Sequence, residues 1–245
     1  MKKIILFIIL LINFPLVYGN GYAIIHDPDG YVNLRKREDF ESNAIIGKVY
    51  NDSPVACEDE ITPNSRFCYI KTEGKSGFVH KDRLLFLDES SKFEKLKLIQ
   101  KSKTSASFKN SHAKLFVSVK HDQLKKSDYS TNIDRFGNRV YLFKGKDFFG
   151  TDGEPVSSIY RFSNISLNLG NKLLTVPQSD FSQAFIPEYS INSGEIFQNL
   201  YAYINPKDNH AYIFSLLADG AALYTIVFEF RNDKYYRKYI WSEAI

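Results

Sequence analysis

The histidines are the first candidates for chemistry, because imidazole is the commonest general base and a frequent metal ligand. They are His26, His80, His112, His121 and His210. No two of them stand at a spacing that would bring both onto one metal within a single element. His210 follows Asp208 at the start of a predicted hairpin, and a solvated turn explains this pair better than an acid–base couple does. The sequence also lacks Gly-x-Ser-x-Gly, His-Glu-x-x-His, a Walker loop and Cys-x-x-Cys.

Three carboxylates in the second half could meet in space: Asp152, Glu154 and Asp219. Such a group could serve as the carboxylate pair of a glycosidase or, with loop carbonyls, as a calcium site. Nothing in the sequence places them together, so glycosidase activity has no support. We therefore predict a protein that is not an enzyme, with no catalytic residue, no metal and no cofactor.

Cys57 and Cys68 are the two cysteines of the chain. If residues 55–58 and 67–71 pair as strands, the two thiols can lie opposite each other and close the loop that contains Pro63. We predict a disulfide, worth roughly 2–3 kcal/mol on a loop-entropy basis. Two buried free thiols are the alternative. A catalytic cysteine is not expected, because no histidine accompanies either residue in a recognisable family signature.

The first 19 residues have the pattern of a secretory signal peptide. Lys2 and Lys3 precede an apolar run over residues 4–17, and the small Gly19 suits a cleavage site. An uncleaved anchor is the alternative, but the run is shorter than the ~20 residues that a spanning helix needs. We predict cleavage after Gly19 and a periplasmic or secreted protein with no stable membrane span afterwards.

Length and composition describe an ordinary globular chain. A length of 245 residues, 44% hydrophobic and 24% charged, excludes wholesale disorder and a multi-span membrane protein. Aromatic residues make up 15%, which favours β-structure. The net charge of +4 falls to +2 without Lys2 and Lys3, with 30 basic against 28 acidic residues. Such a charge is too small to support nucleic-acid binding.

A change of composition divides the mature chain into two modules. Residues 88–114 hold seven lysines and few bulky side chains, so we predict a polar linker there. A solvated tether explains the basic bias better than contact with anionic lipid or wall polymer does. The first module is then residues 22–87 and the second is residues 115–245. Short strands are predicted in the first module at residues 31–35, 44–49, 55–57, 68–71 and 78–80.

The turns and strands of the first module carry a resemblance. Asp27-Pro28-Asp29-Gly30-Tyr31-Val32-Asn33-Leu34-Arg35 is followed by Ile46-Gly47-Lys48-Val49, by Tyr69-Ile70-Lys71-Thr72, and by Gly74-Lys75-Ser76-Gly77-Phe78-Val79-His80. This order resembles the bacterial SH3 domain over about 65 residues of the 245. Two positions differ: Phe78 and the pair Phe67-Cys68 stand where the family commonly has Trp. The resemblance implies a small β-barrel of exported bacterial proteins, some of which bind cell-wall peptides.

The candidate ligand groove of this module is a set of aromatic and polar residues. They are Tyr31, Asn33, Arg35, Phe40, Phe78 and His80. Exposed aromatic rings beside one cation and one amide suit a peptide that carries a carboxylate. The alternative is that Tyr31 and Phe78 only cover the end of a barrel, while Arg35 pairs with Glu38 or Asp39.

The second module is predicted to be a separate antiparallel β-sandwich or partial barrel. Strands are expected at residues 115–119, 139–143, 159–169, 173–177, 200–204, 210–216, 221–230 and 235–241. The last four should form a meander, and residues 178–197 a short helix or an irregular crossover. The predicted fold class is therefore all-β, a small SH3-like barrel followed by this second β-domain.

These features together predict an exported, non-enzymatic binding protein. Its SH3-like module and its β-domain would recognise a cell-wall peptide or a protein partner, and no nucleic acid. Two alternatives stay open: a periplasmic immunity or inhibitor protein, and a cell-wall hydrolase with an SH3-like targeting module. The sequence does not indicate an oligomeric state.

Overall fold

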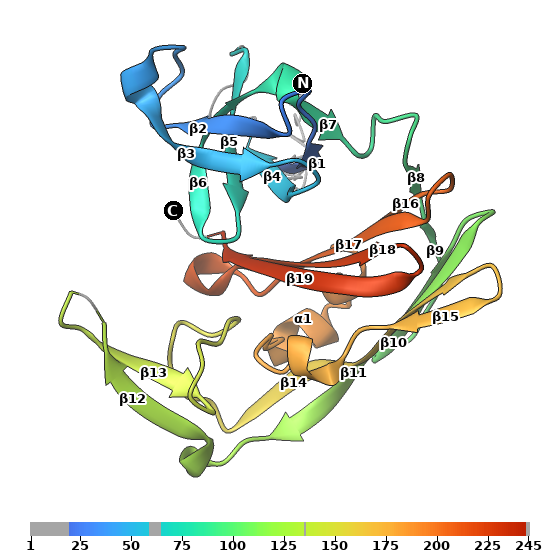
Figure 1. Cartoon of the computed structure of the whole chain (residues 1–245). Helices are drawn as coiled ribbons and strands as arrows, with labels where there is room; N and C mark the ends of the chain where they lie inside the picture. The colour runs from blue at the N-terminus through green and yellow to red at the C-terminus, as the bar shows by residue number, and fades with distance from the viewer. Residues whose placement is uncertain (1–19, 59–64, 135, 244–245) are drawn as a thin grey trace, which may run out of the picture.

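The computed structural model describes residues 20–58, 65–134 and 136–243 and shows an all-β protein (Figure 1). The predicted signal peptide, residues 1–19, and its cleavage site after Gly19 lie outside the described residues. All pairs of the labelled strands are antiparallel, and the α-helix α1 (Glu188–Asn192) has five residues. The all-β prediction is confirmed.

The first module is one seven-stranded sheet in the spatial order β3-β2-β6-β5-β4-β1-β7. β3 and β7 are its edges, so these strands form an open sheet. The five predicted strands are present, and β1 and β7 are additional. The bounds are β1 (Asn20–Ile25), β2 (Tyr31–Arg35), β3 (Ile45–Tyr50), β4 (Pro54–Glu58), β5 (Phe67–Thr72), β6 (Lys75–His80) and β7 (Leu84–Phe86).

All seven strands contribute to one apolar core, around which the sheet curls. Alternation along β2 sends Val32 and Leu34 into this core and leaves the residues between them on the outer face. The Cys57–Cys68 disulfide is buried in the same core and joins the neighbouring strands β4 and β5, with the two Cα atoms 5.8 Å apart. The predicted disulfide is therefore confirmed.

The remaining strands form two five-stranded sheets and a separate hairpin. The sheets have the orders β15-β14-β11-β10-β9 and β19-β18-β17-β16-β8. The bounds are β8 (Glu94–Lys95), β9 (Lys97–Lys101), β10 (Ser105–Lys109), β11 (Ala113–Gln123), β12 (Tyr129–Ile133), β13 (Arg139–Phe143), β14 (Ser158–Leu169), β15 (Lys172–Thr175), β16 (Leu200–Asn205), β17 (His210–Leu217), β18 (Tyr224–Arg231) and β19 (Lys234–Ser242).

The stretch predicted as a polar linker, residues 88–114, is part of these two sheets. It holds β8, β9 and β10, which pair with β16 and β11. Phe93 and Leu96, on either side of β8, and Phe108 in β10 are buried in the apolar cores, and their burial holds this stretch in the sheets. The lysines of these strands, Lys95, Lys97, Lys101 and Lys109, are exposed to solvent.

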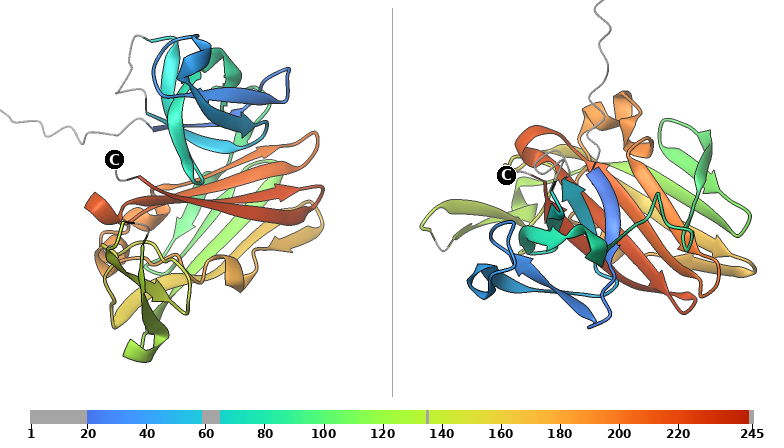
Figure 2. Two further views of the ribbon diagram at one scale, coloured as in Figure 1. Left: turned by 60° about the vertical axis from the view of Figure 1, so that its left-hand side comes forward. Right: turned by 90° about the horizontal axis from the view of Figure 1, so that it is seen from above.

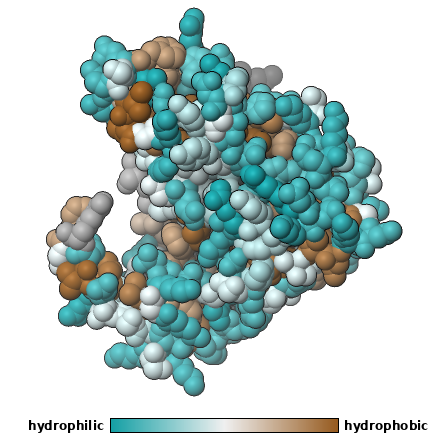
Figure 3. Space-filling view, viewed as in Figure 1, coloured by the Kyte–Doolittle hydropathy of each residue, from teal (hydrophilic) through white to brown (hydrophobic). Residues whose placement is uncertain are grey.

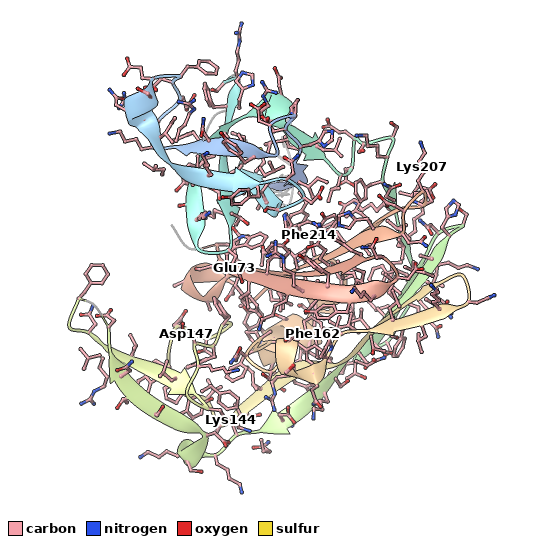
Figure 4. The ribbon with its side chains drawn as sticks, in the orientation of Figure 1. Glu73, Lys144, Asp147, Phe162, Lys207 and Phe214 are labelled. Atoms are coloured by element: carbon pink, nitrogen blue, oxygen red, sulfur yellow. A yellow bond between two sulfur atoms is a disulfide. The ribbon has the colours of Figure 1, made fainter. Side chains whose placement is uncertain are left out.

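The molecule has three layers, of which the β16–β19 sheet is the middle one (Figures 1 and 2). One face of this sheet packs on the β9–β15 sheet around a large apolar core, and the other packs on the first module. Figure 4 shows Phe162 in the lower of these two layers of side chains and Phe214 in the upper one. Because β18 is buried on both faces, its residues are apolar almost without alternation.

Short 3-10 turns and α1 connect the strands. The turns are Ser42–Ala44, Lys81–Arg83, Lys126–Asp128, Gln178–Asp180, Glu195–Phe197 and Gly220–Ala222. The crossover predicted over residues 178–197 holds two of these turns and α1. The β12–β13 hairpin projects from the body, and Figure 3 shows a hollow between this arm and the first module.

Candidate functional site

The catalytic and metal-binding groups considered above come together only in part. No three His, Cys, Asp or Glu side chains are placed there to hold a metal ion. Asp152 and Glu154 line one cavity with Asp147 and Arg139, whereas Asp219 is not among its lining residues. No helix of residues 20–58, 65–134 and 136–243 has both the length and the apolar character needed to cross a membrane.

His210 belongs to a buried ionic network and not to a solvated turn alone. Asp208 accepts a hydrogen bond from the His210 backbone, as a turn would require, but the His210 ring lies 2.7 Å from Glu229 Oε1. Glu229 is fully buried and also accepts hydrogen bonds from Arg231 and Tyr239. Burial acts to raise the pKa of Glu229, but His210, Arg231 and Tyr239 together hold it below its usual value.

A second buried network ties the end of the chain to the first module. Lys71 Nζ lies 2.7 Å from Glu58 Oε1 and donates a hydrogen bond to the Glu243 backbone oxygen at 2.6 Å. Trp241 donates to Glu243 Oε1 at 2.8 Å. Burial raises the pKa of Glu243, and the contacts from Thr225, Lys71 and Trp241 offset only part of this rise. The Lys71 network joins the first module to the β16–β19 sheet, whereas the Glu229 network joins the adjacent strands β17, β18 and β19 within that sheet.

The predicted groove residues of β2 lie on the outer face of the first module. Tyr31, Asn33 and Arg35 are half-buried and alternate with Val32 and Leu34 in the core. The structure then separates them into two places. Arg35 lies among the other predicted aromatic residues, and Tyr31 lies toward the second module.

Arg35, Phe40 and His80 come together with Phe67, which the sequence analysis considered only as a Trp replacement. The Phe40 ring centroid is 5.0 Å from that of Phe67 and 5.5 Å from that of His80. The guanidinium carbon of Arg35 lies 5.7 Å from the Phe40 centroid. Phe40 is 65% exposed, so an aromatic ring and a cation are both offered to solvent here. We name these four residues and Phe78 the Arg35 face.

Phe78 extends this face along β6. It is the cross-strand partner of Arg35, and its ring packs edge-on against Tyr69 with the centroids 5.1 Å apart. The neighbouring Gly77 allows the close approach of β6 to β2, because a Cβ atom there would lie 2.6 Å from the Arg35 backbone oxygen. The register of these strands therefore sets where Arg35 and Phe78 stand.

The alternative ion pair for Arg35 does not form. Asp39 and Glu41 pair with Arg37 instead. Within the described part of the chain, Arg35 makes no ion pair, and its guanidinium donates one hydrogen bond to the Glu41 backbone oxygen at 3.1 Å. Arg37 thus holds the 36–44 loop, while the charge of Arg35 stays uncompensated beside the exposed ring of Phe40.

Tyr31 lies beside Tyr50, which lines a cleft at the junction of the two modules. Lys48 Nζ lies 3.6 Å from the Tyr31 ring centroid, and the Tyr50 ring is 6.4 Å away. Tyr50 lines a cavity of about 300 Å³ between the first module and β18–β19, together with Lys75, Arg231, Tyr236 and Arg237. Asn33 pairs with Lys48 across β2 and β3, on the same side as Tyr31. Tyr31 and Asn33 therefore lie beside this face without belonging to it.

Comparison with protein-family models, with curated proteins and with solved structures found no match for this chain. The SH3 resemblance stays a prediction from the motifs. Sequence reasoning missed three residues near this site: Phe67, Lys48 and Tyr50. Strand alternation could have indicated them, because it places each on the outer face of the first module or at its rim.

Proposed function

We propose that this chain is an exported, non-enzymatic binding protein whose first module is SH3-like and recognises a peptide that carries a carboxylate. The peptide belongs to the cell wall or to an exported protein partner. The observation that carries the proposal is the uncompensated charge of Arg35 beside the exposed ring of Phe40. A buried or paired arginine would not be available to a ligand, whereas this one is preset by its contacts to Glu41 and Phe40.

The chemistry of the face suits this ligand. A guanidinium binds a carboxylate through charge-assisted hydrogen bonds, each stronger than a neutral one. The exposed ring of Phe40 offers apolar area for the adjoining side chain or backbone, the buried Phe67 supports that ring, and His80 can accept or donate a hydrogen bond. Aromatic residues and arginine are also the residue types most enriched at binding hot spots.

Export is supported by two features. The signal-peptide pattern of residues 1–19 is one, and the Cys57–Cys68 disulfide is the other, because disulfides persist in oxidising compartments. The motif order of residues 27–80 and the curling of seven strands around one core support the SH3-like fold of the first module.

Calorimetric titration with purified wall stem peptides, and a pull-down from an extract of exported proteins, test this proposal. We expect binding in one of the two arms, weakened about 10-fold or more by Arg35→Gln, since a hydrogen bond to a charged group is worth about 1.5–3 kcal/mol. Lys36→Gln is the matched control, because it removes the same charge one residue away. Blank results in both arms would refute the proposal, and a cleared band in a wall zymogram would favour the hydrolase alternative.

A further inference from the structure

The β12–β13 hairpin has an edge that no other strand covers. The two strands form a sheet of their own, which projects from the body (Figure 1). A two-stranded hairpin with open edges is only marginally stable in water and is a template for a further strand. The described part of the chain supplies no such strand.

The hydrogen-bond pattern shows which backbone groups of β12 face outward. Lys144 N–H donates to the Asp128 oxygen at 2.7 Å, and Asp134 N–H donates to the Asn138 oxygen at 2.9 Å. Because hydrogen-bonded pairs alternate in an antiparallel ladder, the even-numbered residues between them face β13. Tyr129, Thr131 and Ile133 therefore turn their backbone groups to the outer edge.

Thr131 is the residue whose outward groups are available. The Tyr129 N–H donates a hydrogen bond to the Lys126 backbone oxygen, and the Ile133 N–H donates one to the Asn132 side chain at 2.9 Å. Among the described residues, no hydrogen bond involves either the N–H or the C=O of Thr131 at this edge. One donor and one acceptor thus stand side by side, in the spacing that an added strand pairs with.

A cavity of about 530 Å³ lies beside β12. Three consecutive residues of β12 line it, Tyr129, Ser130 and Thr131, whereas β13 contributes Tyr141. Tyr129, Thr131 and Tyr141 share one face of the hairpin, so the cavity lies against that face, next to β12. The opposite wall is the segment Pro155–Ser157.

The cavity offers an apolar interior and one cation. Tyr141 and Val156 are half-buried there with Leu124 beneath them, and the exposed Lys126 stands at the rim. Lys126 makes no ion pair with any residue that the structure describes. The lining therefore suits an apolar side chain with a carboxylate close to it.

We propose that β12 binds an extended segment of a protein partner as an added strand. The segment pairs with Thr131, places one apolar side chain in the cavity between β12 and Val156, and presents an acidic residue to Lys126. Main-chain pairing supplies the affinity, and the cavity selects the side chain. This site is separate from the Arg35 face and does not depend on it.

The probe is a phage-displayed library of random nine-residue peptides, selected on the Arg35→Gln variant so that the Arg35 face contributes nothing. Selected sequences are synthesised and measured by fluorescence anisotropy. We expect Thr131→Pro, which removes the outward N–H, to weaken binding about 10-fold or more. Arg139→Pro is the matched control, because it removes an outward N–H from the opposite edge, and it should bind as before.

If Thr131→Pro disturbs the hairpin, a second set of peptides tests the same pairing without changing the hairpin. Each of these peptides is methylated at a different backbone nitrogen. We expect methylation at one or two alternate positions to abolish binding and methylation at the others to leave it unchanged. Failure to select any peptide, or equal binding to Thr131→Pro and insensitivity to methylation, would overturn the proposal. A dimer that dissociates in Thr131→Pro would also overturn it, in favour of a second copy of this chain.

Discussion

The ring of Tyr22 in β1 stacks on Phe214 in β17, with the centroids 4.3 Å apart and the planes inclined by 27°. The two residues come from opposite ends of the chain and are both buried. Ile24, Leu87 and Trp241 belong to the same apolar cluster, so the two modules share a core. The first module is therefore held in a fixed position relative to the β16–β19 sheet.

Phe214→Ala should destabilise both modules together. Deleting a buried ring costs about 3–5 kcal/mol, and the shared core should make unfolding a single transition. Urea unfolding followed by far-UV circular dichroism and by the fluorescence of Trp241 would measure both quantities. Two separated transitions in the wild type would show that the modules fold independently.

Loss of the disulfide should destabilise the protein moderately. The Cys57–Cys68 bond closes a short loop, with a sequence separation of 11, so the double variant Cys57→Ala and Cys68→Ala should lose about 2–3 kcal/mol. Thermal unfolding of this variant and of the reduced wild type, each compared with the oxidised wild type, checks the value. Equal stability of oxidised and reduced protein would contradict it.

Glu229 should make stability depend on pH. Its pKa is lowered in the folded protein, so its stabilising contribution is complete above the unfolded pKa of about 4.3 and is lost as the pH falls through the folded value. Glu229→Gln should cost about 3 kcal/mol at pH 7, because it leaves Arg231 without its buried partner.

The difference between wild type and Glu229→Gln should then narrow as the pH is lowered below 4. Denaturant unfolding at several pH values measures this difference. Glu41→Gln removes an exposed partner of Arg37 and should change stability by less than about 1 kcal/mol at every pH. A constant gap for Glu229→Gln would contradict the assignment.

Gly77→Ala should disturb the Arg35 face by separating β6 from β2. The added Cβ atom would meet the Arg35 backbone oxygen, at a residue whose φ is +152°. The strands must move apart, which we expect to cost about 2 kcal/mol and to weaken peptide binding. Gly74→Ala is the control for the added methyl, because no atom lies within 4 Å of its Cβ position, although its φ is also positive. Unfolding and titration of both variants would show whether the close approach matters.

Strand β2 and the strands of the C-terminal meander could be predicted from the sequence, because the alternation of apolar and polar residues is a local pattern. Val32 and Leu34 alternate with Tyr31, Asn33 and Arg35, and the structure keeps this alternation. Along β14 the alternation is interrupted, since a register shift opposite Ser118 and Val119 brings Phe162 into the core with Ile165. A bulge depends on the partner strand and leaves no mark in the sequence of β14.

The contacts that decide the site depend on pairing between distant segments. His210 was considered with its neighbour Asp208, but its buried partner is Glu229, on the adjacent strand β18. In the same way, the lysine-rich composition of β8–β10 predicts a linker and not strands. Phe93 and Phe108 are buried by contacts with distant strands, which the local sequence does not indicate. Phe67 contacts Phe40 because β5 and the 36–44 loop lie side by side in the fold.

The central claim is that Arg35 recognises a carboxylate, and a four-way comparison tests it most directly. A peptide that binds is prepared with its free carboxylate and as the amide, and each form is titrated into wild type and Arg35→Gln. We predict that amidation weakens binding to the wild type about 10-fold and has no effect on Arg35→Gln. Equal loss on amidation in both proteins would contradict the claim, because the carboxylate would then be bound elsewhere.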